Sequence, residues 1–258
     1  MTYPGGKDGP GVYQAIVSRM PPHRVYVEPF LGGGAVMRRK RPAALNIGFD
    51  LDLDPAAVAA TEAFTAGDGG AAGGPRYRFE VGDALAFLRG YSFAGDELVY
   101  CDPPYLLGTR RSGRSLYAFE LGDERHPDLL DIMLGLPCMV MVSGYWSELY
   151  AGRLAGWHAT SFPAVTRGGR VATEWLWCNF PLPLALHDYA HLGRDYRERE
   201  RIRKKKRRWL DRLRGLPLLE RQALLAALQK AGFEPAPAPL PGSAATAGTG
   251  GASSPPWP

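Results

Sequence analysis

Short apolar runs alternate with stretches of helical periodicity along the first two thirds of the chain. The runs have the length of strands and lie at residues 25–27, 46–49, 78–81, 98–101, 138–142 and 174–178. Between them, residues 12–20, 55–63, 84–89 and 127–134 suit helices. This alternation predicts an α/β domain with a mainly parallel sheet, in which ligands bind at the carboxyl ends of the strands.

The pattern changes near residue 188. Residues 189–233 predict helices and no strands, with leucines at helical spacing between residues 216 and 228. Residues 234–258 consist mainly of Pro, Ala, Gly, Ser and Thr, which bury too little apolar surface to order a chain. We therefore expect a main domain at 1–188, a helical extension at 189–233 and a disordered tail at 234–258.

Composition narrows the class of protein. The chain has 258 residues, of which 45% are hydrophobic, enough for one sizeable core. It has neither an apolar run long enough to span a membrane nor the layout of a signal peptide at its start, so we expect a cytoplasmic protein. Its three cysteines lack the spacing of a zinc site or a disulfide framework, and no metal is expected.

Positive charge is concentrated in the extension. Residues 194–214 contain twelve Lys or Arg and four Asp or Glu, a local net charge of +8, which leaves −3 for the rest of the chain. A solvated helix face would explain such a run, but the excess over the whole chain favours contacts with a polyanion. Within this run, Lys204, Lys205 and Lys206 are the candidate phosphate contacts.

A glycine-rich turn follows the first predicted strand, with the sequence Glu28-Pro29-Phe30-Leu31-Gly32-Gly33-Gly34. Glycines allow the backbone to turn sharply and to approach a ligand closely. The carboxylate of Glu28 would repel a phosphate and would attract a cation. The turn therefore favours a cationic ligand such as S-adenosylmethionine, which carries a sulfonium and an ammonium group.

Acidic residues also follow the next two predicted strands. Asp50 suits a carboxylate that accepts hydrogen bonds from ribose hydroxyls. Asp83 either caps the helix at 84–89, meets an adenine amine, or does both.

The tetrad Asp102-Pro103-Pro104-Tyr105 follows the fourth predicted strand. Two prolines form a stiff corner that offers carbonyl groups and no N–H groups. A carboxylate, an exposed carbonyl and an aromatic ring together match an aromatic amine, because Asp102 and the Pro103 carbonyl can accept its hydrogens while Tyr105 stacks on the ring.

These motifs, in this order, resemble those of the Dam-like adenine-specific DNA methyltransferases. The resemblance runs from Tyr3-Pro-Gly-Gly-Lys7 to about residue 180 and includes Ser143-Gly-Tyr145 and Glu174-Trp-Leu-Trp-Cys-Asn179. It implies a Rossmann-like methyltransferase fold with a seven-stranded, mainly parallel sheet. It also implies S-adenosylmethionine as cofactor, DNA as partner and direct methyl transfer to the N6 amine of a flipped-out adenine.

The resemblance also implies site residues. The catalytic corner would be Asp102, Pro103, Pro104 and Tyr105, and the cofactor would be held by Tyr3, Lys7, Glu28, Pro29, Phe30, Gly32, Gly34, Asp50, Asp83 and Asp102. The better-known members carry a target-recognition domain before the catalytic tetrad, whereas here residues 84–101 leave no room for one. Sequence recognition is therefore either reduced or comes from elsewhere. The two candidates are the basic extension and the loop after Tyr105, with Arg110, Arg111, Arg114 and Tyr117.

Four other functions share parts of this pattern. RNA and protein-amide methyltransferases share the cofactor half, although they more often carry Asn where Asp102 stands. Cytosine also offers an exocyclic amine to the same corner. A catalytically inactive DNA-binding module on a methyltransferase scaffold is the alternative from a different class.

Overall fold

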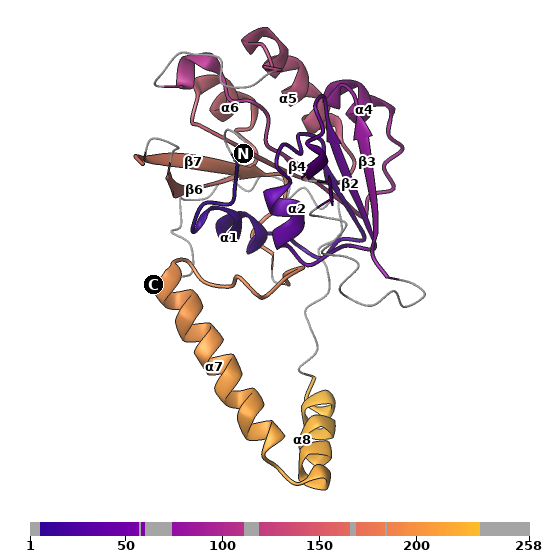
Figure 1. The fold of residues 1–258 in the computed structure, drawn as a ribbon, viewed down its shortest axis with the longest axis vertical. Coiled ribbons are helices and arrows are strands. Elements are labelled where there is room, and N and C mark those ends of the chain that lie inside the picture. Colours follow the sequence, from indigo (N-terminus) through magenta and orange to yellow (C-terminus); the bar gives the residue numbers. More distant parts are fainter. Residues whose placement is uncertain are drawn as a thin grey trace.

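The computed structural model describes residues 6–56, 58–59, 74–110, 119–165, 169–183 and 185–232. One seven-stranded sheet runs through the main body, with the strand order β3-β2-β1-β4-β5-β7-β6 (Figure 1). All pairs between β3 and β5 are parallel, while β7 is antiparallel to both β5 and β6. The predicted fold class, a Rossmann-like α/β fold with a mainly parallel seven-stranded sheet, is confirmed.

Six of the strands overlap the apolar runs of the sequence, whereas β6 was not predicted. They are β1 (Val25–Glu28), β2 (Leu45–Asp50), β3 (Arg76–Val81), β4 (Glu97–Cys101), β5 (Met139–Gly144), β6 (His158–Val165) and β7 (Val171–Cys178). The helices of the body are α1 (Val12–Val17), α2 (Ala35–Arg39), α4 (Ala84–Gly90), α5 (His126–Gly135) and α6 (Glu148–Arg153). The helix expected at 55–63 lies largely outside the described residues.

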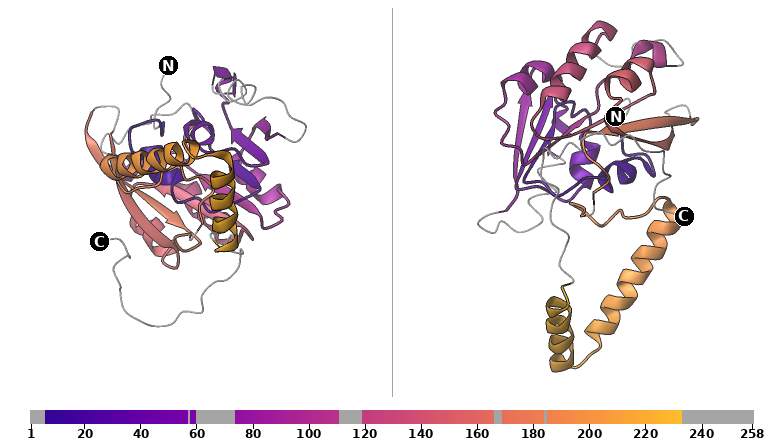
Figure 2. Two further views of the ribbon diagram at one scale, coloured as in Figure 1. Left: turned by 90° about the horizontal axis from the view of Figure 1, so that it is seen from below. Right: turned by 180° about the vertical axis from the view of Figure 1, so that it is seen from behind.

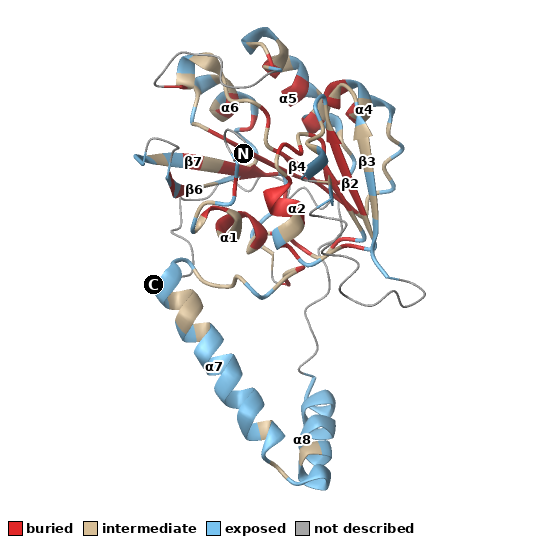
Figure 3. Cartoon of the chain, viewed as in Figure 1, coloured by how far each residue is buried: buried red, intermediate tan, exposed pale blue. Residues whose placement is uncertain are grey.

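Helices cover both faces of the sheet, and each face has its own apolar core. Side chains alternate along the strands, so Tyr26, Tyr100 and Met141 pack with α1 and α2. Val99 and Val140, on the opposite face, pack with α4, α5 and α6. The central strands are buried on both faces (Figure 3), which explains why they appear in the sequence as continuous apolar runs.

The extension forms two helices, α7 (Tyr196–Arg214) and α8 (Leu218–Lys230), that project from the body as an arm (Figures 1 and 2). Neither helix contains a buried residue. Asp195 caps α7, since its Oδ1 accepts a hydrogen bond of 2.8 Å from the Glu198 backbone N–H. None of the described helices is long and apolar enough to cross a membrane.

The segment that leads into the arm lies against the amino-terminal edge of the sheet. The His187 backbone N–H donates to the Met20 carbonyl at 2.9 Å, and the Arg41 N–H donates to Asp188 Oδ2 at 3.0 Å. Met20 and Arg41 precede β1 and β2, respectively. The arm therefore begins at the edge of the sheet opposite to the carboxyl ends of its parallel strands.

Candidate active site

A cavity of about 310 Å³ lies at the carboxyl ends of the first four strands. An acidic residue at or just beyond the end of each strand lines it: Glu28 and Asp50 end β1 and β2, whereas Asp83 and Asp102 follow β3 and β4. Parallel pairing brings these ends to one edge, although the residues are far apart in the sequence. The cavity has the size of a small-molecule site and a lining suited to positive charge.

The glycine turn forms one wall of the cavity. Gly32 and Gly34 have φ angles of 48° and 62°, a region that other residues seldom adopt, and Gly34 begins α2. The Gly32 N–H donates to Asp50 Oδ2 at 2.7 Å, so Asp50 fastens the turn to the next strand. Pro29 and Phe30 also line the cavity. The structure thus brings together the residues of the turn and Asp50.

Asp83 performs the helix-capping role left open by the sequence, and it also lines the cavity. Its Oδ1 accepts hydrogen bonds from the Leu85 and Ala86 N–H groups at 2.8 and 3.0 Å, which caps α4. Its Oδ2 lies 2.7 Å from Arg125 Nη2. Burial opposes ionisation of Asp83, but Arg125 and the cap hydrogen bonds together lower its pKa.

Asp102 lies at the centre of a polar network between the cavity and the sheet. Lys7 Nζ is 2.8 Å from Asp102 Oδ2 and donates to the Tyr105 hydroxyl at 2.9 Å. The hydroxyls of Ser143 and Tyr105 donate to Asp102 Oδ1 at 2.7 and 3.2 Å. The Tyr100 and Ser143 hydroxyls are hydrogen-bonded at 2.8 Å. These contacts hold the carboxylate in one orientation at the end of β4.

The two prolines turn the chain away from the strand beside this network. Pro103 is buried, and Pro104 lines the cavity. The Tyr105 ring meets the Tyr145 ring edge-on, with 4.7 Å between centroids and 64° between planes. Tyr145 follows β5, so aromatic rings from two neighbouring strand ends lie together next to Asp102.

A second buried cluster lies beneath the glycine turn. Glu28 is 3% exposed, and the Tyr26 hydroxyl donates to its Oε2 at 3.0 Å. Burial raises the pKa of Glu28 to about 8, so this carboxyl group is largely protonated at neutral pH. Nearby Lys40 donates to Asn46 Oδ1 at 2.9 Å and to the Arg41 carbonyl at 3.1 Å, and burial lowers its pKa to about 7.

Glu174 was missed as a site residue in the sequence. It lies on β7 and is 8% exposed, and its Oε2 is 3.7 Å from Lys7 Nζ. A glutamate in the apolar run 174–178 was the sequence signal that could have indicated it. Because β7 is antiparallel to β5, the start of the run 174–178 lies beside the carboxyl end of β5, and this pairing cannot be inferred from the run alone. Ser143 and Tyr145 were recognised as parts of a motif, without a role.

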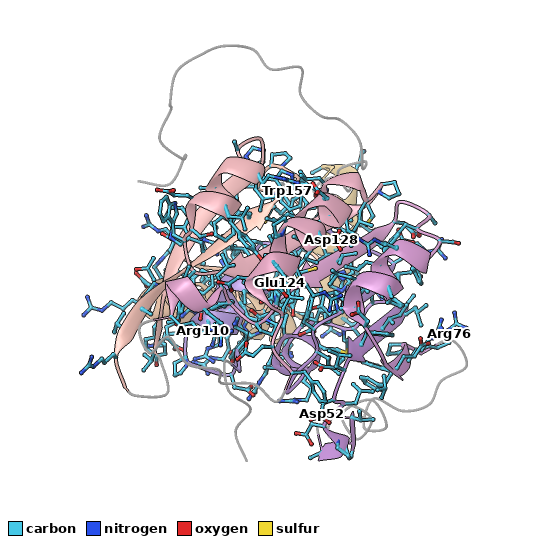
Figure 4. All side chains as sticks on the ribbon, turned by 90° about the horizontal axis from the view of Figure 1, so that it is seen from above. Asp52, Arg76, Arg110, Glu124, Asp128 and Trp157 are labelled. Carbon is cyan, nitrogen blue, oxygen red and sulfur yellow. The ribbon has the colours of Figure 1, made fainter. Side chains whose placement is uncertain are left out.

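The residues expected to contact DNA lie in different surroundings. Arg110 is buried and forms a two-pronged ion pair with Glu120, with N–O distances of 2.7 and 2.6 Å. In the view of Figure 4, Arg110 overlaps the body of the molecule, whereas Asp52, which lines the cavity, lies at the periphery. Lys204, Lys205 and Lys206 are exposed on α7, away from the cavity. Tyr3, Arg111, Arg114 and Tyr117 lie outside the described residues.

No protein-family profile matches the chain, and no curated protein matches its sequence. Solved structures match its fold at low identity. An rRNA methylase from Streptococcus thermophilus is 12% identical, with 64% of this chain and 93% of that chain covered and a TM-score of 0.38. An O-methyltransferase of tomaymycin synthesis from Streptomyces achromogenes, in complex with SAM, is 16% identical, with 65% and 77% covered and a TM-score of 0.37.

A precorrin 8W decarboxylase from Methanobacterium thermoautotrophicum matches to a similar extent, with 14% identity, 63% of this chain and 84% of that chain covered and a TM-score of 0.34. Matches of this extent assign no activity to this chain. Its function has to be argued from the site.

Proposed function

We propose that the protein transfers a methyl group from S-adenosylmethionine to the exocyclic N6 amine of adenine in DNA. One observation carries the proposal: the Asp102-Pro103-Pro104-Tyr105 corner borders a cavity lined by glycines and by four carboxylates, with Lys7 bonded to Asp102. A cationic donor and an amine acceptor are the two partners that such a corner suits.

The cavity fits the donor in size and in chemistry. When bound, S-adenosylmethionine supplies a methyl group activated by a sulfonium. Glu28, Pro29, Phe30, Gly32 and Gly34 would surround its methionine part, where the close approach of the backbone and the carboxyl oxygens of Glu28 suit an ammonium donor. Asp50 would accept hydrogen bonds from the ribose, and Asp83 would lie near the adenine. Tyr3 would complete this site, as the family resemblance implies.

The corner after β4 would hold the acceptor. The amine of adenine is a weak nucleophile because its lone pair is delocalised into the ring. Hydrogen bonds from its two hydrogens to Asp102 and to the Pro103 carbonyl would free that lone pair, and Tyr105 would stack on the base. The network of Lys7, Ser143 and Tyr105 fixes Asp102 in advance, so that positioning and electrostatics account for catalysis.

A base within a duplex would have to leave the stack to reach this corner, at a cost of roughly a few kcal/mol. We propose that affinity for DNA offsets this cost through the loop after Tyr105, with Arg111, Arg114 and Tyr117, and through Lys204, Lys205 and Lys206 on α7. Arg110, being paired with Glu120, would act by anchoring the base of that loop. Because α7 begins at the opposite edge of the sheet, its lysines would raise affinity without touching the reacting base.

Asp102→Ala tests the proposal. It removes the acceptor of the amine hydrogen while retaining the cavity lined by Glu28 and Asp50. We expect methyl transfer to DNA to fall at least 100-fold. The variant should also lose stability, because buried Lys7 keeps only Glu174 as a neighbouring carboxylate, but it should remain folded. Incorporation of a labelled methyl group into DNA measures the rate. A folded Asp102→Ala variant that retains a tenth or more of the activity would contradict the proposed chemistry.

A further inference from the structure

Lys7 cancels much of the negative charge at the catalytic corner. Its Nζ lies 2.8 Å from Asp102 Oδ2, and the two side chains are 5% and 17% exposed. The pair carries no net charge, so its effects on a charge cancel largely at distances well beyond 2.8 Å. Asp102 still accepts a hydrogen bond from an amine in contact with it, but by itself the pair would attract a cationic donor only weakly from further away.

Glu174 adds a second carboxylate to this pair. Its Oε2 is buried and has no hydrogen-bond partner among the described residues, and at 3.7 Å from Lys7 Nζ it is too far away for a hydrogen bond. Burial, and then the nearby charge of Asp102, raise the pKa of Glu174, against the lowering effects of Lys7 and of a hydrogen bond with Tyr105. Such an oxygen is costly to bury. Since Lys7 is already held by Asp102 and Tyr105, Glu174 is not required to position it.

We propose that Glu174 gives the cluster of Lys7, Asp102 and Glu174 a net negative charge, and that this charge makes the site prefer a cationic methyl donor to its neutral demethylated product. The inference rests on the proposed function, in which the donor is a sulfonium. Glu28 does not replace this charge, because it is largely protonated at neutral pH.

The charge of the cluster would act at two stages of the cycle. It would attract the donor and then stabilise the positive charge as that charge passes from the donor to the acceptor amine beside Asp102. Once the methylated amine has released its proton to solvent water, both products are neutral and the attraction ends. The same carboxylate would thereby favour exchange of the spent product for a fresh donor.

Glu174→Gln tests this role, because it removes the charge and keeps the shape of the side chain. Calorimetry at pH 7.5 would measure the Kd of S-adenosylmethionine and of S-adenosylhomocysteine, which lacks the methyl group and the charge. The preference for the cation is the Kd of S-adenosylhomocysteine divided by the Kd of S-adenosylmethionine. We expect this ratio to fall about tenfold in the variant. Glu80→Gln on β3 is the matched control, since Glu80 pairs with Arg78 on the surface and its loss should leave the ratio unchanged.

The outcomes separate the inference from the function on which it rests. An unchanged ratio in a Glu174→Gln variant that still binds both ligands would overturn the inference and leave the proposed function intact. A wild-type protein that binds neither ligand would overturn the proposed function itself. Glu174→Asp keeps the charge and should keep most of the preference, so a folded aspartate variant without any preference would also overturn the inference. This second variant decides the question if the glutamine variant fails to fold.

Discussion

Lys7→Met should expose how strongly the buried cluster depends on its one cation. The substitution removes the ammonium that lies 2.8 Å from Asp102 Oδ2 and 3.7 Å from Glu174 Oε2, and leaves two carboxylates in one site. The three side chains are 5%, 17% and 11% exposed, so solvent screens them little. Removing one partner of a buried ion pair lowers the free energy of unfolding by about 3–5 kcal/mol. Without Lys7, protonation of Glu174 would remove one of the two remaining charges, so we expect a loss near the lower value.

The pH dependence of this contribution follows from the pKa of Lys7. Burial acts to lower that pKa, but Asp102 and then Glu174 outweigh it and raise the value above the ordinary 10.5. A cation whose pKa is raised on folding contributes its full stabilisation below its ordinary pKa and loses it only as the pH rises through the higher folded value. The contribution of Lys7 should therefore be fully present at pH 7.

Urea unfolding at pH 7 measures the free energy of unfolding, which we expect to fall by about 3 kcal/mol in Lys7→Met. In thermal unfolding, the same loss corresponds to a decrease of roughly 6–12 °C in Tm. The double variant Lys7→Met with Glu174→Gln has only the Asp102 carboxylate in the cluster, so it should recover at least about 1 kcal/mol of that loss. A loss below about 1 kcal/mol for Lys7→Met, or strictly additive effects in the double variant, would refute this view of the cluster.

Three further substitutions probe other parts of the molecule. Glu28→Gln should gain stability relative to wild type between pH 5 and pH 8, because over this range the Glu28 carboxyl of wild type ionises in the unfolded chain but stays protonated in the fold, where burial raises its pKa to about 8; equal pH profiles in urea would contradict this. Asp83→Ala should cost about 1–2 kcal/mol by removing the cap of α4, measured by thermal unfolding, with exposed Asp52→Ala as a neutral control. Changing Lys204, Lys205 and Lys206 to Glu should weaken DNA binding and flatten its salt dependence while kcat stays unchanged; an unaltered salt slope would reject their role.

The sequence predicted the central strands well because each is buried on both faces and forms a continuous apolar run. It did not predict β6, and the reason is the position of this strand. β6 is one of the two edge strands and pairs only with β7, so exposed positions interrupt its apolar pattern and Pro163 is tolerated within it. Helix α6 was also missed, since six residues with one buried side chain show little periodicity.

For the candidate site, the sequence predicted those residues that belong to motifs directly after a strand. The glycine turn and the tetrad after β4 each follow one strand directly, and parallel pairing brings them together. The sequence could not indicate partners supplied by distant segments, such as Glu174 beside Lys7. Arg110 shows the same limit, because a basic loop residue near a catalytic motif suggests DNA binding, whereas its guanidinium is engaged by Glu120 ten residues away.

Incubation of the wild-type protein with duplex DNA and methyl-labelled S-adenosylmethionine, followed by nucleoside analysis, tests the central claim most directly. Parallel reactions with RNA and with DNA lacking adenine distinguish the polymer and the base. The account predicts label in N6-methyladenine, from DNA only, and loss of that label in the Asp102→Ala variant. Label in N4-methylcytosine or in RNA nucleosides alone, or no label from any nucleic acid, would contradict it.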